Sequence, residues 1–285
     1  MDGRDADQGR PARAPPRGGA RLLSAARRHL EGERDAPRQR RRGGEDPLAP
    51  RPAHARAPPR SERPVKLALA LFGKPVVPGR VKTRLAPALG EAGAAALYGA
   101  FLEDVVARAG ALFPPTLWVA GDPAHPSLPD LPRRAQEGRD LGARMEHALA
   151  SALTRADAVL LVGTDVPTLP ARLLRAAAAA LRKREVVFAP SHDGGYVLVG
   201  ARRPLRFGDV RWSSPHALAD SLRAEPEAAL IEPWYDVDTP RDLALLRAHL
   251  ALDPAAAPRT AAALRDLPHA AETRAAAAPW YPAAR

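Results

Sequence analysis

Four cationic side chains lie close together in one short segment. Lys74, Arg80, Lys82 and Arg84 share a stretch that also contains two glycines and two prolines. Lysine binds a phosphate group as a point charge, and arginine can bind it through two parallel hydrogen bonds. The stretch follows an apolar run, residues 65–72, that is typical of a buried strand of a parallel sheet. Since open α/β sheets bind ligands beyond the carboxyl ends of their strands, this loop predicts a phosphate site.

A solvated basic turn is the alternative interpretation of these four charges. The combination of strand, Gly/Pro loop and clustered cations favours the phosphate site over that alternative. The site is neither a Walker loop nor a Rossmann fingerprint, because the spacings GxxxxGK[ST] and GxGxxG are both absent from the segment.

Acidic residues follow three further predicted strands. Asp165 comes after the most apolar run, Asp193 lies in a glycine turn, and Asp236 and Asp238 precede a predicted helix. Each has a local alternative: Asp165 could accept bonds from loop N–H groups, Asp193 could shape its turn, and Asp238 could cap the helix. We expect all three loops at one edge of the sheet. Carboxylates beside a phosphate loop would repel the ligand without a bridging cation, so they predict Mg²⁺ or a similar ion.

The composition excludes several classes of site. With no cysteine among 285 residues, disulfides, thiolate zinc sites and cysteine nucleophiles are excluded. No apolar run approaches the roughly 18 residues of a membrane helix, and the N-terminal residues lack the apolar centre of a secretory signal. We therefore expect a cytoplasmic protein without a membrane partner.

The net charge of +11 is concentrated in residues 1–63, which contain 16 Arg, no Lys and nine Asp or Glu. This segment is also rich in Pro, Ala and Gly, so we expect a disordered tail. A nucleic-acid-binding segment is the alternative, but no aromatic residues alternate with the arginines to stack on bases. We therefore expect no nucleic-acid partner.

Strands alternate with helices over residues 64–251, which predicts one α/β/α sandwich with a mainly parallel sheet. Asp140 and Thr239, the latter followed by Pro240, are the expected N-caps of two helices. Residues 252–285 are Ala/Pro-rich with little periodicity, and we expect them to be poorly ordered. The expected strands are residues 65–72, 116–121, 158–163, 186–190, 196–201 and 229–234, and the expected helices are residues 90–113, 140–156, 170–184, 215–223 and 239–250.

Six ordered motifs carry a family resemblance: FGKPVVPGRVKTRL, EGRDLGARM, VGTDVPTLP, APSHDGGYVLVG, RWSS and DVDTPRDL. Over about residues 64–250 the chain resembles the GT-A-fold radical-SAM/selenodomain-associated transferases, a group linked to arsenosugar biosynthesis glycosyltransferases. It is distantly similar to 2-phospholactate guanylyltransferase and to molybdenum-cofactor nucleotidyltransferases. The resemblance implies a GT-A fold of the nucleotide-diphospho-sugar transferase type.

The resemblance also implies roles for individual residues. Asp165 and Asp238 would hold Mg²⁺ or Mn²⁺. Asp165 and Asp193 would be the catalytic residues, and Asp193 is the first candidate for a base on the acceptor side. Trp212 could stack on a base or sugar, with packing as its alternative. The residues implied for the nucleotide phosphates are Lys74, Lys82, Arg84, Gly142 and Arg144, and those implied for the acceptor or sugar are Gly194, Gly195, Tyr196 and Trp212.

Two reactions are compatible with this layout. In the first, a metal-dependent glycosyltransferase takes a nucleotide-diphosphate sugar and a small-molecule acceptor. In the second, a nucleotidyltransferase takes a nucleoside triphosphate and a phosphorylated acceptor.

Overall fold

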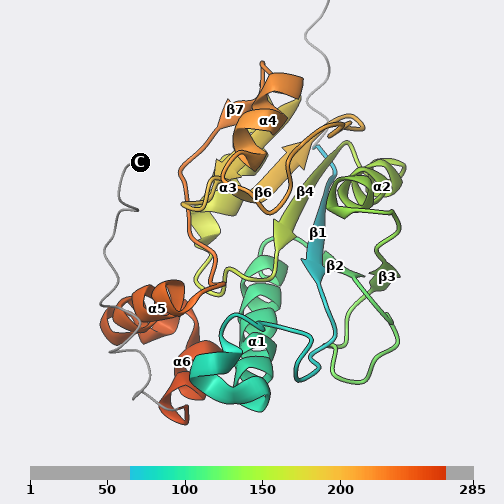
Figure 1. Ribbon diagram of the computed structural model, residues 1–285. Helices are drawn as coiled ribbons and strands as arrows, with labels where there is room; N and C mark the ends of the chain where they lie inside the picture. Colours follow the sequence, from blue (N-terminus) through green and yellow to red (C-terminus); the bar gives the residue numbers. More distant parts are fainter. Residues whose placement is uncertain (1–64, 268–285) are drawn as a thin grey trace, which may run out of the picture. The chain divides into compact units, whose positions relative to one another are not determined.

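The structure is a computed structural model that describes residues 65–267 (Figure 1). The expected tail over residues 1–63 and the end of the chain from residue 268 lie outside the described residues. Within them, no helix combines the length and apolarity needed to cross a membrane. In chain order the elements are β1 (Leu67–Gly73), α1 (Ala86–Gly110), β2 (Pro115–Val119), β3 (Arg133–Ala135), α2 (Leu141–Leu153), β4 (Ala158–Gly163), α3 (Ala171–Ala180), β5 (Val186–Pro190), β6 (Tyr196–Ala201), α4 (Ala217–Ala224), β7 (Ala229–Leu230), α5 (Pro240–Leu252), a 3-10 turn η1 (Pro254–Ala256) and α6 (Pro258–Arg265).

Seven strands form one sheet in the order β3-β2-β1-β4-β6-β5-β7. Among the strands of the described residues, only β6 is antiparallel to its neighbours, β4 and β5. The other strands therefore run in one direction, and β1, β4 and β5 end at the same edge. Figure 1 shows this edge at the ends of β1 and β4. The loops that carry the predicted cations and acids leave the sheet at this edge.

Helices cover both faces of the sheet. The alternating side chains of the strands pack on one face against α1 and α3, and on the other against α2 and α4. A third cluster joins α1 to α5 and α6, beyond the carboxyl edge of the sheet. The prediction of a three-layer α/β/α fold with a mainly parallel sheet is confirmed.

The predicted helix starts are confirmed where a cap was expected. Asp140 accepts a hydrogen bond from the Ala143 N–H at 2.8 Å and begins α2. Thr239 begins α5 in a reciprocal capping arrangement with Asp242. Both caps are set by residues three positions apart, so a sequence pattern can show them.

Three expectations about elements are wrong. Strand β3 lies in a segment that we expected to be loop, and it is only three residues long. The strand expected over residues 229–234 pairs only at Ala229–Leu230, with an isolated bridge at Trp234. The poorly ordered segment expected from residue 252 contains η1 and α6.

Helix α6 is ordered by a residue far away in the sequence. The buried Asp104 of α1 accepts hydrogen bonds from the N–H groups of Arg259 (3.2 Å) and Thr260 (2.8 Å). These N–H groups open the helix and have no partner inside it. Leu264 and Ala261 are buried in the same cluster as α1. The low periodicity of the segment could not reveal an anchor on another helix.

Asp104→Ala should therefore destabilise the protein by about 2–3 kcal/mol, because buried N–H groups at the start of α6 would lose their acceptor. Chemical unfolding would measure this, and amide exchange should accelerate first in residues 258–265. Glu103→Ala is the matched control, since within residues 65–267 Glu103 makes only an exposed ion pair with Arg259 at 3.0 Å. It should cost at most about 1 kcal/mol. Equal losses in the two variants would contradict the anchoring role.

Candidate active site

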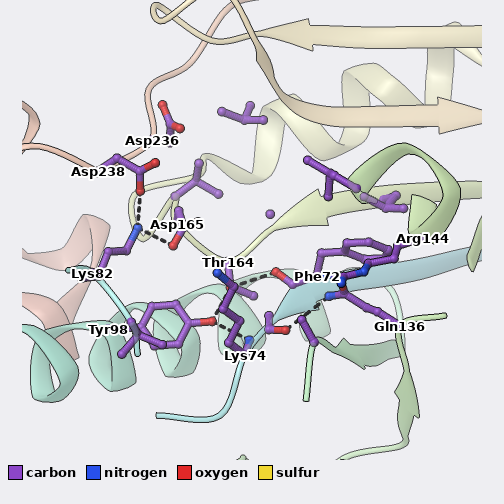
Figure 2. A pocket seen from close by; sticks show the side chains of 18 of the residues that line it. Phe72, Lys74, Lys82, Tyr98, Gln136, Arg144, Thr164, Asp165, Asp236 and Asp238 are labelled. Atoms are coloured by element: carbon purple, nitrogen blue, oxygen red, sulfur yellow. Dashed lines mark hydrogen bonds and ion pairs between the residues drawn. The ribbon is translucent and has the colours of Figure 1, made fainter. Parts of the chain in front are cut away.

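A cavity of about 540 Å³ opens at the carboxyl edge of the sheet, beyond β1 and β4. Figure 2 shows that its lining has two ends: Asp165, Asp236, Asp238 and Lys82 lie at one, and Gln136 and Arg144 lie at the other. The predicted site residues that line it are Lys74, Lys82, Arg84, Arg144, Asp165, Tyr196 and Asp238. Those that do not line it are Gly142, Asp193, Gly194, Gly195 and Trp212.

Lys82 joins the cationic loop to the two carboxylates. Its Nζ pairs with Asp165 Oδ1 and lies 2.6 Å from Asp238 Oδ1. The side chain of Lys82 is only 4% exposed, whereas those of Asp165 and Asp238 are 41% and 43% exposed. The ammonium thus approaches the carboxylates from the protein side. The cationic loop and the two acids share one cavity, as predicted, but Lys82 is bound to carboxylates.

The ammonium of Lys82 is charged at neutral pH. Burial alone would lower the pKa of Lys82, but the charges of Asp165 and Asp238 and their hydrogen bonds outweigh burial and raise it above its usual value. The rings of Tyr98 and Phe101 lie 6.0 and 5.7 Å from Nζ and add attraction for a cation.

A chain of hydrogen bonds fixes the start of the cationic loop (Figure 2). The Lys74 N–H donates to the Tyr98 hydroxyl at 2.9 Å, which lies 3.0 Å from Thr164 Oγ1. Thr164 in turn donates to the carbonyl of Phe72 at 3.0 Å, so Tyr98 is the donor to Thr164. Burial, followed by the charge of Asp165, raises the pKa of Tyr98 to about 12, and the hydroxyl stays protonated. The chain ties β1, α1 and β4 together beneath the cavity.

The remaining loop cations have no such partners. Within the described residues, the side chains of Lys74, Arg80 and Arg84 make no ion pair or hydrogen bond, and all three line the cavity. Arg144 donates through Nε to the Gly138 carbonyl at 3.2 Å. These side chains leave positive charge for an anionic ligand.

At the other end of the cavity, Gln136 donates both of its amide hydrogens to backbone carbonyls. Nε2 lies 2.9 Å from Trp118 O and 3.3 Å from Gly73 O. Its Oε1 makes no hydrogen bond within the described residues. Gln136 can therefore offer a ligand an acceptor only.

Gly142 packs against the indole of Trp212. A Cβ on Gly142 would lie 2.8 Å from Trp212 Nε1, so the indole needs a glycine there. Trp212 also meets Phe207 and Tyr196 edge-on, at 5.4 and 6.3 Å between ring centroids. The implied contacts of Gly142 with phosphate and of Trp212 with sugar remain predictions, because neither residue lines the cavity.

Asp193 shapes its own turn, as its alternative interpretation states. Its Oδ1 accepts the Gly195 N–H at 2.8 Å. Asp236 lines the cavity, and its Oδ1 accepts the Ser191 hydroxyl at 2.7 Å. Burial raises the pKa of Asp236, the charges of Asp193 and Asp238 add to this rise, and the bond from Ser191 opposes it. The catalytic role of Asp193 remains a prediction.

The cavity residues that the sequence interpretation missed include Tyr98, Thr164 and Ser213. Thr164 carried a signal, because it immediately precedes Asp165. Tyr98 falls among the apolar residues of a helix and looked like core. Ser213 and Lys82 are the two non-glycine residues with positive φ in the described part of the chain, at +56° and +46°. Such backbone is uncommon and is often held at functional sites.

Asp165 and Asp238 fit a divalent cation. Each has one oxygen on Lys82, and the other makes no hydrogen bond within the described residues. No group of three or more protein ligands suited to a metal is present in residues 65–267. A cation here would depend on substrate oxygens and water for its other ligands, as Mg²⁺ commonly does.

The chain is similar to one described protein family and to solved structures. A family model described as "Uncharacterized protein conserved in bacteria (DUF2064)" matches residues 103–214. A solved structure from Desulfovibrio desulfuricans G20, provisionally assigned as a nucleotide-diphospho-sugar transferase, is 32% identical with a TM-score of 0.64. The similarity covers 70% of this chain and 94% of that one. No curated protein matches this chain.

Two further structures share the fold at lower similarity. One is a CMP:2-keto-3-deoxy-manno-octonic acid synthetase complexed with CTP, with 12% identity, 66% and 99% coverage of this and that chain, and a TM-score of 0.44. The other is Rv0371c from Mycobacterium tuberculosis H37Rv in complex with manganese, with 21% identity, 64% and 97% coverage, and a TM-score of 0.41.

Proposed function

We infer that this chain, which belongs to the family of the Desulfovibrio desulfuricans protein, is a transferase that uses a nucleotide-diphosphate sugar as donor and a small molecule as acceptor. The observation that carries the proposal is the meeting of Asp165 and Asp238 with the cationic loop in one cavity. The narrower resemblance to radical-SAM/selenodomain-associated transferases remains a prediction.

The cavity suits a ligand with a diphosphate in its middle. We place the nucleoside near Gln136 and Arg144, and the diphosphate between Lys74 and the two carboxylates (Figure 2). Lys74, Arg80 and Arg84 are free to bind phosphate oxygens. Negative charge develops on the departing nucleoside diphosphate, and cations around it lower the barrier.

Asp165 and Asp238 would hold Mg²⁺ or Mn²⁺ through their free oxygens. When bound, the ion would supply further positive charge at the diphosphate. Tyr196 lines the cavity, and burial raises the pKa of its hydroxyl, so this residue offers no base at neutral pH. Asp236 lies beside the carboxylate pair, where the sugar and acceptor would meet.

Nucleotidyl transfer is the second candidate, because three unpaired loop cations could also bind a triphosphate. A binding screen of nucleotide sugars and nucleoside triphosphates, with Mn²⁺ and with EDTA, tests both. We expect a nucleotide sugar to bind only with Mn²⁺, and its turnover to release a nucleoside diphosphate. Pyrophosphate release from a triphosphate would favour nucleotidyl transfer instead. If no nucleotide of either kind binds, both candidates are wrong.

A further inference from the structure

Lys82 fills the space between two carboxylates that a metal ion would otherwise neutralise. We propose that Lys82 is the resident cation of the nucleotide-free site, and that it keeps the affinity for a free divalent ion low until a nucleotide binds. The inference deepens the proposed function and rests on its metal site, although not on which group is transferred.

Lys82 halves the net charge of the carboxylate pair. Asp165 and Asp238 both reach one atom, Lys82 Nζ, so their two negative charges lie close together. Lys82 reduces the net charge of this cluster from two negative charges to one. A divalent ion that approached the free oxygens would be attracted by one net negative charge, and it would face an ammonium behind the carboxylates.

Because Lys82 is buried, water screens its charge little. Water screens the charge of an exposed lysine, but Lys82 is 4% exposed and lies near the rings of Tyr98 and Phe101. Its backbone has a φ of +46°, which L-residues rarely adopt, so the surrounding structure holds this residue in place. The positive charge is therefore both unscreened and fixed.

Nucleotide binding should reverse the effect of Lys82 on the metal. Nucleotide phosphates would bring at least two negative charges to the same cavity, which offsets the opposing charge of Lys82. Metal and nucleotide should then each raise the affinity for the other by the same factor, as reciprocal coupling requires. Because of Lys82, the site would bind the metal ion together with the nucleotide and would bind the free ion only weakly.

The test measures Mn²⁺ binding to the full chain without nucleotide, by the paramagnetic resonance signal of free Mn²⁺. Lys82→Gln removes the charge and keeps an N–H donor for the carboxylates. We expect it to bind Mn²⁺ at least about tenfold more tightly than the wild type. Lys82→Arg keeps the charge and should stay weak. Lys66→Met is the matched control: this exposed lysine lies at the opposite end of β1, and the affinity should stay within about twofold.

A second variant tests whether the net charge of the cluster sets the affinity for Mn²⁺. Lys82→Met/Asp238→Asn removes one charge of each sign, so it restores the net charge of the cluster and should return the Mn²⁺ affinity to about the wild-type level. The inference is overturned if Lys82→Gln binds Mn²⁺ no more tightly than the wild type, or if the double variant binds as tightly as Lys82→Gln. If Lys82→Gln does not fold, the wild type can still test the inference. Inorganic pyrophosphate should then raise the affinity of the wild type for Mn²⁺, and an unchanged affinity would overturn the inference.

Failure of this inference differs from failure of the proposed function. If wild-type protein binds a nucleotide sugar with Mn²⁺ but Lys82→Gln shows no tightening, the transferase proposal stands and the role of Lys82 is wrong. If Lys82→Gln tightens Mn²⁺ binding but no nucleotide binds to the wild type, the role of Lys82 in free-ion binding stands and the transferase proposal is wrong.

Discussion

Asp165→Asn should abolish Mn²⁺-dependent nucleotide binding and lower turnover by about 10³-fold. The substitution keeps the shape of the side chain and removes one of the two carboxylate charges that would hold the ion. Asp238 alone would then share its charge with Lys82, and the pair would carry no net charge for a divalent ion. Calorimetric titration with nucleotide, with and without Mn²⁺, measures the first effect, and a steady-state assay measures the second.

Asp209→Asn is the control for this experiment. Asp209 is an exposed residue of the loop before α4, and it makes no ion pair within the described residues. It carries the same charge change outside the cavity, so binding and turnover should stay within about twofold of the wild type. If Asp165→Asn keeps the Mn²⁺ dependence of the wild type, the carboxylate pair is not the metal site.

The shared edge of the sheet could be predicted because it depends on local patterns. Apolar runs identify the strands, and the parallel arrangement places the loop after each run at the same edge. Asp165 and Asp238 therefore meet the cationic loop, although these two acids are 73 positions apart in the sequence. The caps at Asp140 and Thr239 are likewise local, since each cap and its partner lie three residues apart.

The pairing of Lys82 with two carboxylates could not be predicted, because it depends on which loop cation is buried. In the sequence Lys82 is equivalent to Lys74 and Arg84, three cations of one loop. In the structure only Lys82 turns inward, where α1 supplies Tyr98 and Phe101 and the two carboxylates supply its partners. A charge pattern shows how many cations a loop has, and tertiary packing decides which of them remain free.

The roles of two polar helix residues could not be predicted either, because these roles also depend on tertiary packing. Asp104 and Tyr98 interrupt an apolar helix face, yet each satisfies a group from a distant segment: Asp104 the first turn of α6, and Tyr98 the backbone of Lys74. A buried polar side chain on a core helix generally has such a partner. The signal is present in the sequence, but the identity of the partner is not.

Gly194→Ala should destabilise the protein by about 3 kcal/mol or more, because two effects add. The residue has a φ of +87°, and a Cβ would lie 2.3 Å from the carbonyl oxygen of Pro215 and 2.6 Å from its Cα. Both atoms belong to backbone. The loop cannot easily retreat, since the Leu218 N–H donates to the Gly194 carbonyl at 3.0 Å. Thermal unfolding should show a Tm lower by roughly 6–12 °C, by the usual scaling for a domain of this size.

Gly208→Ala separates the two effects. Gly208 also has a positive φ, +48°, but no heavy atom of the described part of the chain lies within 4 Å of its potential Cβ. It should therefore lose only the roughly 1–2 kcal/mol of an L-residue in left-handed backbone. A large gap between the two variants would show that Gly194 is required because the β5–β6 turn packs directly on the segment before α4. If instead Gly194→Ala keeps the stability of Gly208→Ala and raises only the KM for the acceptor, the sequence-based interpretation of Gly194 as an acceptor contact would be the correct one.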